Sequence, residues 1–226
     1  MMGAPATILL WKDPAKNKAP APELCCYLLP GKMKRPAVLV IPGGGYGGVC
    51  EATEGEPIAR KFNELGFHAF VLHYRVAPHR FPEPQEDVFR AIRLIRANAG
   101  KWRVIPDQLA VCGFSAGGHL AASAGTLYGE IHADAGDEAD SQEMRPNALI
   151  LCYPVISFTV FPHMGSGKNL LGERFEECRE RYSLEKRVSE KTPPAFLWHT
   201  AEDQTVPWQN SVLMAEALYE KKIPCS

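Results

Sequence analysis

The stretch that decides the fold is Gly113-Phe114-Ser115-Ala116-Gly117-Gly118-His119, which follows the apolar run 109–112. Gly-x-Ser-x-Gly after a buried strand is typical of a nucleophile elbow, where a strand turns sharply into a helix with a serine at its apex. Gly113 and Gly117 suit such a turn because the segments around the serine approach too closely for side chains. The pattern predicts Ser115 as a nucleophile. The alternative is a glycine-rich helix start that binds phosphate or packs tightly.

Strands and helices alternate on both sides of this stretch, which predicts an α/β fold with a largely parallel sheet covered by helices on both faces. The apolar residues at 85–97 have helical spacing, and we expect Arg90, Arg93 and Arg96 to be mostly solvated there. Two short strands before the alternation are expected to be antiparallel. The expected strands are 6–11, 23–29, 37–41, 67–73, 109–112, 148–152 and 195–199, and the expected helices are 56–65, 85–97, 116–128 and 206–220.

Composition favours a single domain, residues 1–226. With 46% hydrophobic and 23% charged residues, a chain of 226 can bury one sizeable core. The long connection 153–194 is expected to form a partial cap. The seven cysteines are an odd number without metal-type spacing, so they are interpreted as reduced structural thiols.

Charge and hydropathy narrow the class of partner. The net charge is −1 and the pI is about 6.7, with lysines and arginines scattered along the chain, which disfavours nucleic acid and anionic membranes. No apolar run is long enough to span a membrane, and the N-terminus lacks a basic segment before an apolar one. We therefore expect a cytoplasmic protein with a small-molecule substrate. A homo-oligomer is compatible with the sequence.

A second feature is Pro42-Gly43-Gly44-Gly45-Tyr46-Gly47-Gly48, at the end of the expected strand 37–41. Glycines let backbone N–H groups approach a reacting carbonyl, where they stabilise the negative charge of acyl transfer. We assign an oxyanion hole to the amides of Gly44, Gly45 and Ala116, and a substrate contact to Tyr46. A phosphate-binding loop is the alternative, but the lysine of a P-loop and a GxGxxG pattern are absent.

A third feature is the acidic segment after the expected strand 195–199. A carboxylate there can orient an imidazole, and in this topology the order is serine, acid, histidine. Asp203 is therefore the expected acid, with Glu202 as the less favoured neighbour. A helix N-cap at Asp203 or Thr205 is an alternative that can coexist with the catalytic role.

These motifs resemble the α/β-hydrolase-fold carboxylesterases, in the branch that holds acetylxylan esterase-like and hormone-sensitive-lipase-like enzymes. The resemblance includes His73-Tyr74-Arg75-Val76-Ala77-Pro78 and an Asp-x-x-Val-Pro pattern at Asp203. It implies a mostly parallel central sheet flanked by helices, with Arg75 and Asp87 as scaffold charges. It also implies a serine carboxylesterase for short acyl esters, acetyl on sugars or xylo-oligosaccharides, that acts through an acyl-serine intermediate. No cofactor or metal is expected, because no cluster has ligand spacing.

The sequence departs from the family pattern at the histidine. The resemblance implies a catalytic histidine beyond one further strand after Asp203, and all seven histidines precede that residue. We therefore expect a truncated chain that lacks the last strand, the histidine and the closing helix. His199 and His163 are the candidates within the chain that could replace the missing histidine, and His119, one turn past Ser115, is expected to be a packing or substrate-binding residue. The alternatives to an active esterase are a non-catalytic hydrolase-fold binding or interaction protein, and an inactive fragment.

Overall fold

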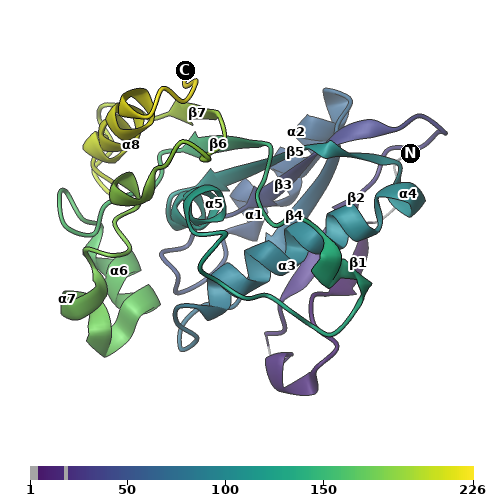
Figure 1. The fold of residues 1–226 in the computed structure, drawn as a ribbon, viewed down its shortest axis with the longest axis horizontal. Helices are drawn as coiled ribbons and strands as arrows, with labels where there is room; N and C mark the ends of the chain where they lie inside the picture. The colour runs from purple at the N-terminus through teal and green to yellow at the C-terminus, as the bar shows by residue number, and fades with distance from the viewer. Residues whose placement is uncertain (1–4, 18–19) are drawn as a thin grey trace.

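Seven strands form one sheet within residues 5–17 and 20–226, which are the residues that the computed structural model describes (Figure 1). The strands lie in the order β1-β2-β4-β3-β5-β6-β7. β2 runs antiparallel to β1 and β4, and all other neighbours are parallel. The mostly parallel sheet is thereby confirmed. The bounds are β1 (Ala6–Leu9), β2 (Glu23–Tyr27), β3 (Arg35–Ile41), β4 (His68–His73), β5 (Val104–Phe114), β6 (Ala148–Cys152) and β7 (Ala195–Trp198).

Helices connect the strands and cover both faces of the sheet. The α-helices of the described residues are α1 (Glu51–Glu54), α2 (Glu56–Glu64), α3 (Glu83–Ala97), α4 (Ala99–Trp102), α5 (Ala116–Thr126), α6 (Met164–Leu171), α7 (Phe175–Cys178) and α8 (Gln209–Glu220). Short 3-10 turns lie at Pro14–Lys16, Glu138–Ser141, Gly172–Arg174 and Leu184–Arg187. The four expected helices correspond to α2, α3, α5 and α8.

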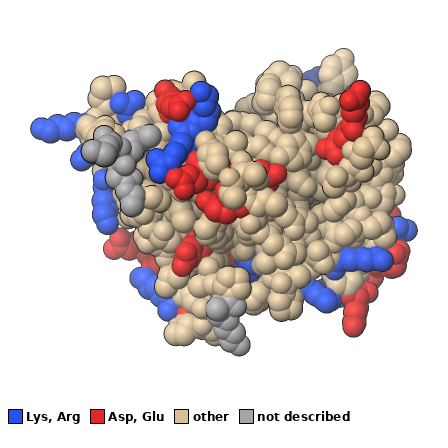
Figure 2. All heavy atoms as spheres, turned by 180° about the vertical axis from the view of Figure 1, so that it is seen from behind, with Lys and Arg blue, Asp and Glu red and all other residues tan. Residues whose placement is uncertain are grey.

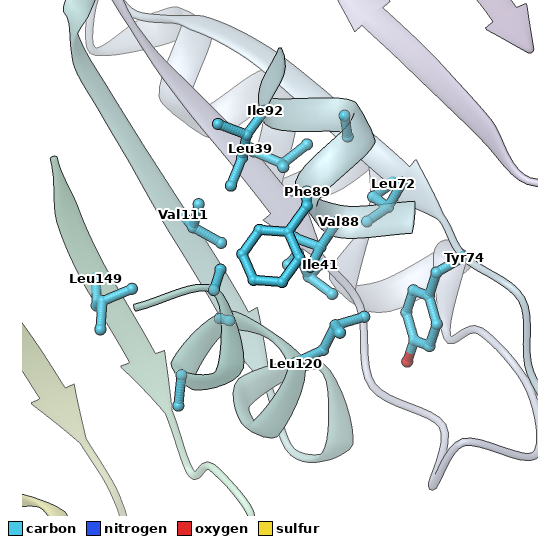
Figure 3. Packing of buried hydrophobic residues seen from close by; sticks show 14 of the residues in the cluster. Leu39, Ile41, Leu72, Tyr74, Val88, Phe89, Ile92, Val111, Leu120 and Leu149 are labelled. Carbon is cyan, nitrogen blue, oxygen red and sulfur yellow. The ribbon is translucent and has the colours of Figure 1, made fainter. Parts of the chain in front are cut away.

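The apolar core lies in two layers, one on each face of the sheet. In Figure 3, Phe89 of α3 and Leu120 of α5 lie over Val111 of β5. On the opposite face, Ala59 of α2 packs in a cluster with Val40 of β3. Central strands buried on both faces are apolar along their whole length, which is why they appear in the sequence as continuous apolar runs.

Some elements begin or end away from their expected bounds. β5 begins at Val104 because Arg35 pairs with Val104 before a register shift in the ladder. α8 begins at Gln209, because the segment before it is a turn around the Asp203 side chain. Helices α6 and α7 lie in the connection 153–194, for which the sequence predicted no regular structure.

The last residues lie beside β7. The amides of Ala195 and Leu197 donate to the carbonyls of Pro224 (3.0 Å) and Ser226 (2.8 Å), and Ala195 pairs with Cys225 in a parallel bridge.

Figure 2 shows a face on which uncharged residues cover most of the surface and charges of both signs are interspersed. No helix among the described residues is both long enough and apolar enough to cross a bilayer.

The prediction for the three arginines of α3 was wrong, because all three are nearly buried. Arg90 is 1% exposed, Arg93 is 9% exposed and Arg96 is 8% exposed. Their guanidinium groups bind the segment before β6: Arg90 pairs with Asp137 at 2.6 Å and Arg93 with Asp134 at 2.7 Å. Arg96 donates to backbone carbonyls of the same segment. A buried guanidinium is tolerated only when such partners replace water.

Arg75 and Asp87 form a buried scaffold pair, as the resemblance implied. Their nearest oxygen and nitrogen lie 2.8 Å apart, and their side chains are 3% and 0% exposed. The Asp87 carboxylate also accepts from the Trp11 indole at 2.7 Å and from the Arg75 backbone N–H at 2.9 Å. The pair therefore joins the N-terminal segment to α3 and to the segment after β4.

Candidate active site

Ser115 sits at the junction of β5 and α5 in a strained backbone conformation. Its φ is 52° and its ψ is −119°. A positive φ is unfavourable for a residue with a side chain: it costs about 1–3 kcal/mol and persists only where surrounding contacts impose it. Those contacts are present. The Ser115 amide donates to the Cys152 carbonyl at 3.1 Å, and the Ser115 carbonyl accepts from the Val155 amide at 3.0 Å. The local geometry is that of a nucleophile elbow.

The two glycines of the elbow have no room for side chains. A Cβ on Gly113 would lie 2.2 Å from the Gly117 carbonyl oxygen, and a Cβ on Gly117 would lie 2.2 Å from the Ile41 carbonyl oxygen. These obstacles are backbone atoms, so no rotamer change can relieve them. The spacing Gly-x-Ser-x-Gly therefore follows from close packing of α5 against the end of β3.

Residues 42–48, here called the glycine loop, follow β3 and lie against the elbow. A Cβ on Gly43 would lie 3.0 Å from Ser115 Cβ. The loop folds on itself, since the amides of Gly47 and Gly48 both donate to the Gly44 carbonyl, at 3.0 and 3.1 Å. Gly44 and Gly45 have φ values of 126° and 64°, a region that favours glycine.

Side chains from three other segments hold the carbonyls and the first amide of the glycine loop. Tyr74 Oη donates to the Pro42 carbonyl at 2.9 Å, and Asn169 Nδ2 of α6 donates to the Gly45 carbonyl at 2.9 Å. Glu54 of α1 accepts from the Gly43 amide at 2.6 Å. In contrast, the amides of Gly44, Gly45 and Ala116 donate no hydrogen bond to any described residue. These are the three amides assigned from the sequence to an oxyanion hole.

Tyr46 and His119 are not where a substrate contact would be. Tyr46 is 0% exposed and His119 is 1% exposed, so neither side chain can touch a substrate in this conformation. Tyr46 has a φ of 57°, and its buried hydroxyl lies 2.9 Å from His119 Nδ1 on α5. The pair joins the glycine loop to α5. Periodicity could not reveal this, because the contact joins residues that are distant in the chain.

Burial also determines the charge of His119. Its Nε2 lies 3.0 Å from the Tyr182 carbonyl, which can only accept, so Nε2 carries the proton and Nδ1 accepts from Tyr46. Desolvation lowers the pKa of His119 to about 4, although the hydrogen bond to Tyr182 opposes the shift. His119 is therefore neutral at pH 7.

Asp203 lies after β7, at the same carboxyl edge of the parallel strands as Ser115. Its Oδ1 accepts from the backbone amides of Thr205 (2.8 Å) and Val206 (2.9 Å). Burial opposes ionisation, but these bonds, with the nearby His199, lower the pKa of Asp203. The alternative of a helix N-cap at Asp203 or Thr205 is wrong, because α8 begins at Gln209 with Trp208 at its N-cap position. Asp203 instead closes a local turn, which leaves its Oδ2 3.5 Å from His199 Nε2.

His199 packs beneath the loop that carries Asp203. Its Nδ1 lies 2.8 Å from Ser211 Oγ, its Nε2 lies 3.0 Å from the Val206 carbonyl, and its side chain is 5% exposed. Both ring nitrogens therefore have partners in the loop and in α8. This arrangement fixes the loop rather than presenting a free nitrogen to Ser115.

His163 approaches the site from the connection between β6 and β7. It caps α6, where its Nδ1 accepts from the Ser166 amide at 3.3 Å and pairs with Ser166 Oγ at 2.7 Å. Ser166 Oγ in turn lies 3.9 Å from where a Cβ of Gly45 would be. Burial lowers the pKa of His163, and the charge of Asp203 opposes that shift. The charge of Asp203 therefore acts on His163, and Ser166 lies between His163 and the glycine loop.

A metal centre is not indicated by the donors near Ser115. No group of three or more histidine, cysteine, aspartate or glutamate side chains among residues 5–17 and 20–226 has the geometry to hold an ion. The chemistry available is that of a serine hydroxyl, backbone N–H donors and a carboxylate. This set matches acyl transfer.

Comparison with known proteins agrees with this geometry. The BD-FAE family matches residues 26–218 of the chain. The endo-1,4-beta-xylanase B of Butyrivibrio fibrisolvens is 42% identical over 90% of this chain and 32% of its own length, and the acetylxylan esterase of Xylanibacter ruminicola is 33% identical over 82% and 37%. The chain thus spans about a third of the length of these curated relatives.

A solved structure resembles the whole chain. The acetyl ester-xyloside bifunctional hydrolase of Caldicellulosiruptor lactoaceticus superposes with a TM-score of 0.92 at 39% identity, covering 100% of this chain and 85% of that one. The esterase Est2 of Thermogutta terrifontis has a TM-score of 0.81 at 25% identity. The fold, the family match and these relatives agree with the motifs: the chain belongs to the BD-FAE family and has the α/β-hydrolase fold.

Proposed function

We propose that this chain is a serine carboxylesterase that removes short acyl groups, acetyl foremost, from xylan-derived sugars. The observation that carries the proposal is the strained Ser115 in contact with the glycine loop, together with the amides of Gly44, Gly45 and Ala116, which donate no hydrogen bond to any described residue. The names of the relatives support the substrate class, since they include an acetylxylan esterase and an acetyl ester-xyloside hydrolase.

In the proposed reaction, Ser115 Oγ attacks the ester carbonyl while an imidazole takes its proton. The three amides hold the oxyanion, and one such donor contributes about 3–4 kcal/mol to the barrier in other hydrolases. Collapse of the tetrahedral intermediate expels the sugar alcohol, which receives the proton, and leaves an acyl-Ser115 ester. Water, deprotonated by the same imidazole, then releases acetate and restores Ser115.

The imidazole is the part of the mechanism with two candidates. The family resemblance implies a histidine beyond one further strand after Asp203, oriented by that carboxylate. Within the described residues, His163 has the best surroundings, because Asp203 acts on it electrostatically and Ser166 links it to the glycine loop. His199 fits less well, because both of its nitrogens are engaged.

The test compares the wild-type chain, Ser115→Ala and a matched control, Ser123→Ala. Ser123 is a buried serine on α5 that donates to the His119 carbonyl, so its substitution removes a hydroxyl from the same helix away from the site. Acetate release from p-nitrophenyl acetate and from acetylated xylo-oligosaccharides is measured. We expect turnover in the wild type and in Ser123→Ala, and none above background in Ser115→Ala.

Two further outcomes decide between the alternatives. Loss of turnover in His163→Ala identifies His163 as the base, and unchanged turnover excludes it. If the folded wild type neither hydrolyses these esters nor forms a Ser115 adduct with a fluorophosphonate, the esterase proposal fails for this chain, and a non-catalytic binding role becomes the better description.

A further inference from the structure

Glu54 joins the carboxyl ends of two strands on either side of the nucleophile. Its Oε2 accepts from the Gly43 amide, at the end of β3, at 2.6 Å. Its Oε1 accepts from the hydroxyl of Tyr153, which directly follows β6, at 2.7 Å. β5, which carries Ser115, lies between β3 and β6 in the sheet. One carboxylate therefore spans the edge at which the proposed reaction takes place.

The contact is close to the reacting serine. A Cβ on Gly43 would lie 2.9 Å from Glu54 Oε2, 2.9 Å from the Phe114 carbonyl oxygen and 3.0 Å from Ser115 Cβ. Gly43 is thus packed between the Glu54 carboxylate and the elbow. Any shift of Gly43 away from Glu54 changes its distance from the nucleophile.

Glu54 holds the amide at the point where the glycine loop leaves β3. The carbonyl of the same Gly43 accepts from the Cys50 amide at 3.0 Å, so both polar groups of this residue are fixed from the region of α1. Next in the chain come Gly44 and Gly45, which lack side chains and can therefore adopt many backbone directions besides their observed positive φ values. The direction of the Gly44 amide depends on how Gly43 is held, and the Gly45 amide, in the peptide group that follows, is also oriented by the bonds of the Gly44 carbonyl to Gly47 and Gly48.

We propose that Glu54 is a positioning residue for the oxyanion hole: by holding the Gly43 amide against Tyr153, it directs the amides of Gly44 and Gly45 toward the substrate carbonyl. This inference rests on the proposed esterase function. Glu54 itself does not touch the reacting atoms in this role. A short hydrogen bond from N–H to an ionised carboxylate is about twice as strong as a neutral one, which suits the task.

The role predicts a specific order among variants. Glu54→Ala removes both acceptors and leaves the Gly43 amide unpaired, so kcat is expected to fall on the order of ten- to hundredfold while KM changes less than about twofold. Glu54→Gln can still accept from Gly43 through its carbonyl and donate to Tyr153 through its NH₂ group, so it is expected to recover most of kcat. Tyr153→Phe removes one of the two hydrogen bonds of Glu54, so its kcat is expected to lie between those of the wild type and Glu54→Ala.

The matched control is Glu56→Ala. Glu56 lies two residues away on α2, carries the same charge and pairs with Arg60 on the surface. We expect its kcat and KM to equal those of the wild type. The comparison separates loss of the Glu54 contacts from loss of a nearby negative charge.

A second measurement does not require activity. Amide hydrogen exchange, followed by mass spectrometry on peptides covering residues 42–50, is expected to be faster in Glu54→Ala than in the wild type, Glu54→Gln and Glu56→Ala. Exchange in peptides from β4 should be equal in all four, which verifies that each variant is folded.

The outcomes keep the two proposals separate. If the wild type shows no Ser115-dependent hydrolysis, the esterase proposal fails, and the exchange experiment alone decides on Glu54. The positioning role is overturned if Glu54→Ala exchanges at residues 42–50 like the wild type. It is also overturned if Glu54→Gln loses as much kcat as Glu54→Ala, because that result assigns the effect to charge.

Discussion

The buried His119 predicts a measurable dependence of stability on pH. The ring is 1% exposed, lies between the Tyr46 hydroxyl and the Tyr182 carbonyl, and packs on Phe158 with ring centroids 4.6 Å apart. Its pKa is lowered from 6.5 to about 4, chiefly by burial. In the unfolded chain the same imidazole titrates near its ordinary value.

The sign follows from proton uptake. Between pH 6.5 and about 4 the unfolded chain binds the proton and the folded protein does not, so stability is full above pH 6.5 and is lost as the pH falls through this window. For these two pKa values the loss is about 2–3 kcal/mol between about pH 7.5 and pH 4.5. The variant His119→Gln cannot titrate. Near neutral pH it should be less stable by about 1–3 kcal/mol, because it disturbs two buried hydrogen bonds.

The assay is urea unfolding of both proteins at the two pH values, followed by fluorescence of the four tryptophans. Other titrating groups act in both proteins and cancel in the difference between them. We expect the advantage of the wild type to shrink by about 2–3 kcal/mol at the lower pH, and to vanish or reverse. A difference that is the same at both pH values would show that His119 titrates normally in the folded protein and would refute the reasoning.

Three further predictions concern residues described above. Gly117→Ala should destabilise the protein by about 3 kcal/mol or more in chemical denaturation, because the new Cβ meets the Ile41 carbonyl oxygen; a midpoint equal to that of the wild type would contradict the close packing. Asp87→Asn removes the fully buried charged partner of Arg75 and leaves only the more exposed Glu86 and Glu83 to pair with the guanidinium, so a loss of about 3–5 kcal/mol is expected, with an unchanged thermal midpoint as the opposing result. Asn169→Leu removes the hydrogen bond from α6 to the glycine loop and should lower kcat on the order of tenfold at nearly unchanged stability. Kinetic and thermal-melting measurements on the same samples check both expectations, and a kcat equal to that of the wild type would exclude this contact from catalysis.

The sequence predicted those parts of the molecule that depend on local backbone geometry. The elbow at Ser115 and the glycine loop need glycines at fixed positions, so their constraint is visible in the chain itself. The apolar runs of the central strands are equally visible, because burial on both faces leaves no polar positions.

What the sequence could not predict depends on partners distant in the chain. The inward position of Tyr46 requires His119, and the burial of Arg90 requires Asp137, which is 47 residues away. Nothing in the pattern around Glu54 marks it as a partner of Tyr153, which is 99 residues distant. Such contacts are decided by tertiary packing, which residue periodicity does not encode.

The three buried arginines of α3 hold a segment that we expect to open separately from the sheet. The segment 134–147 is held to α3 largely by ion pairs and by bonds to backbone carbonyls, whereas the sheet is held by its apolar layers. Releasing this segment exposes little of the core, so it belongs to the units that unfold locally before the whole protein does. We expect a protease to cut the chain there first, and added salt to change the rate of cutting little, because ion pairs that are buried on the arginine side are only weakly screened. The strand edge that carries Ser115 would remain assembled after such a cut.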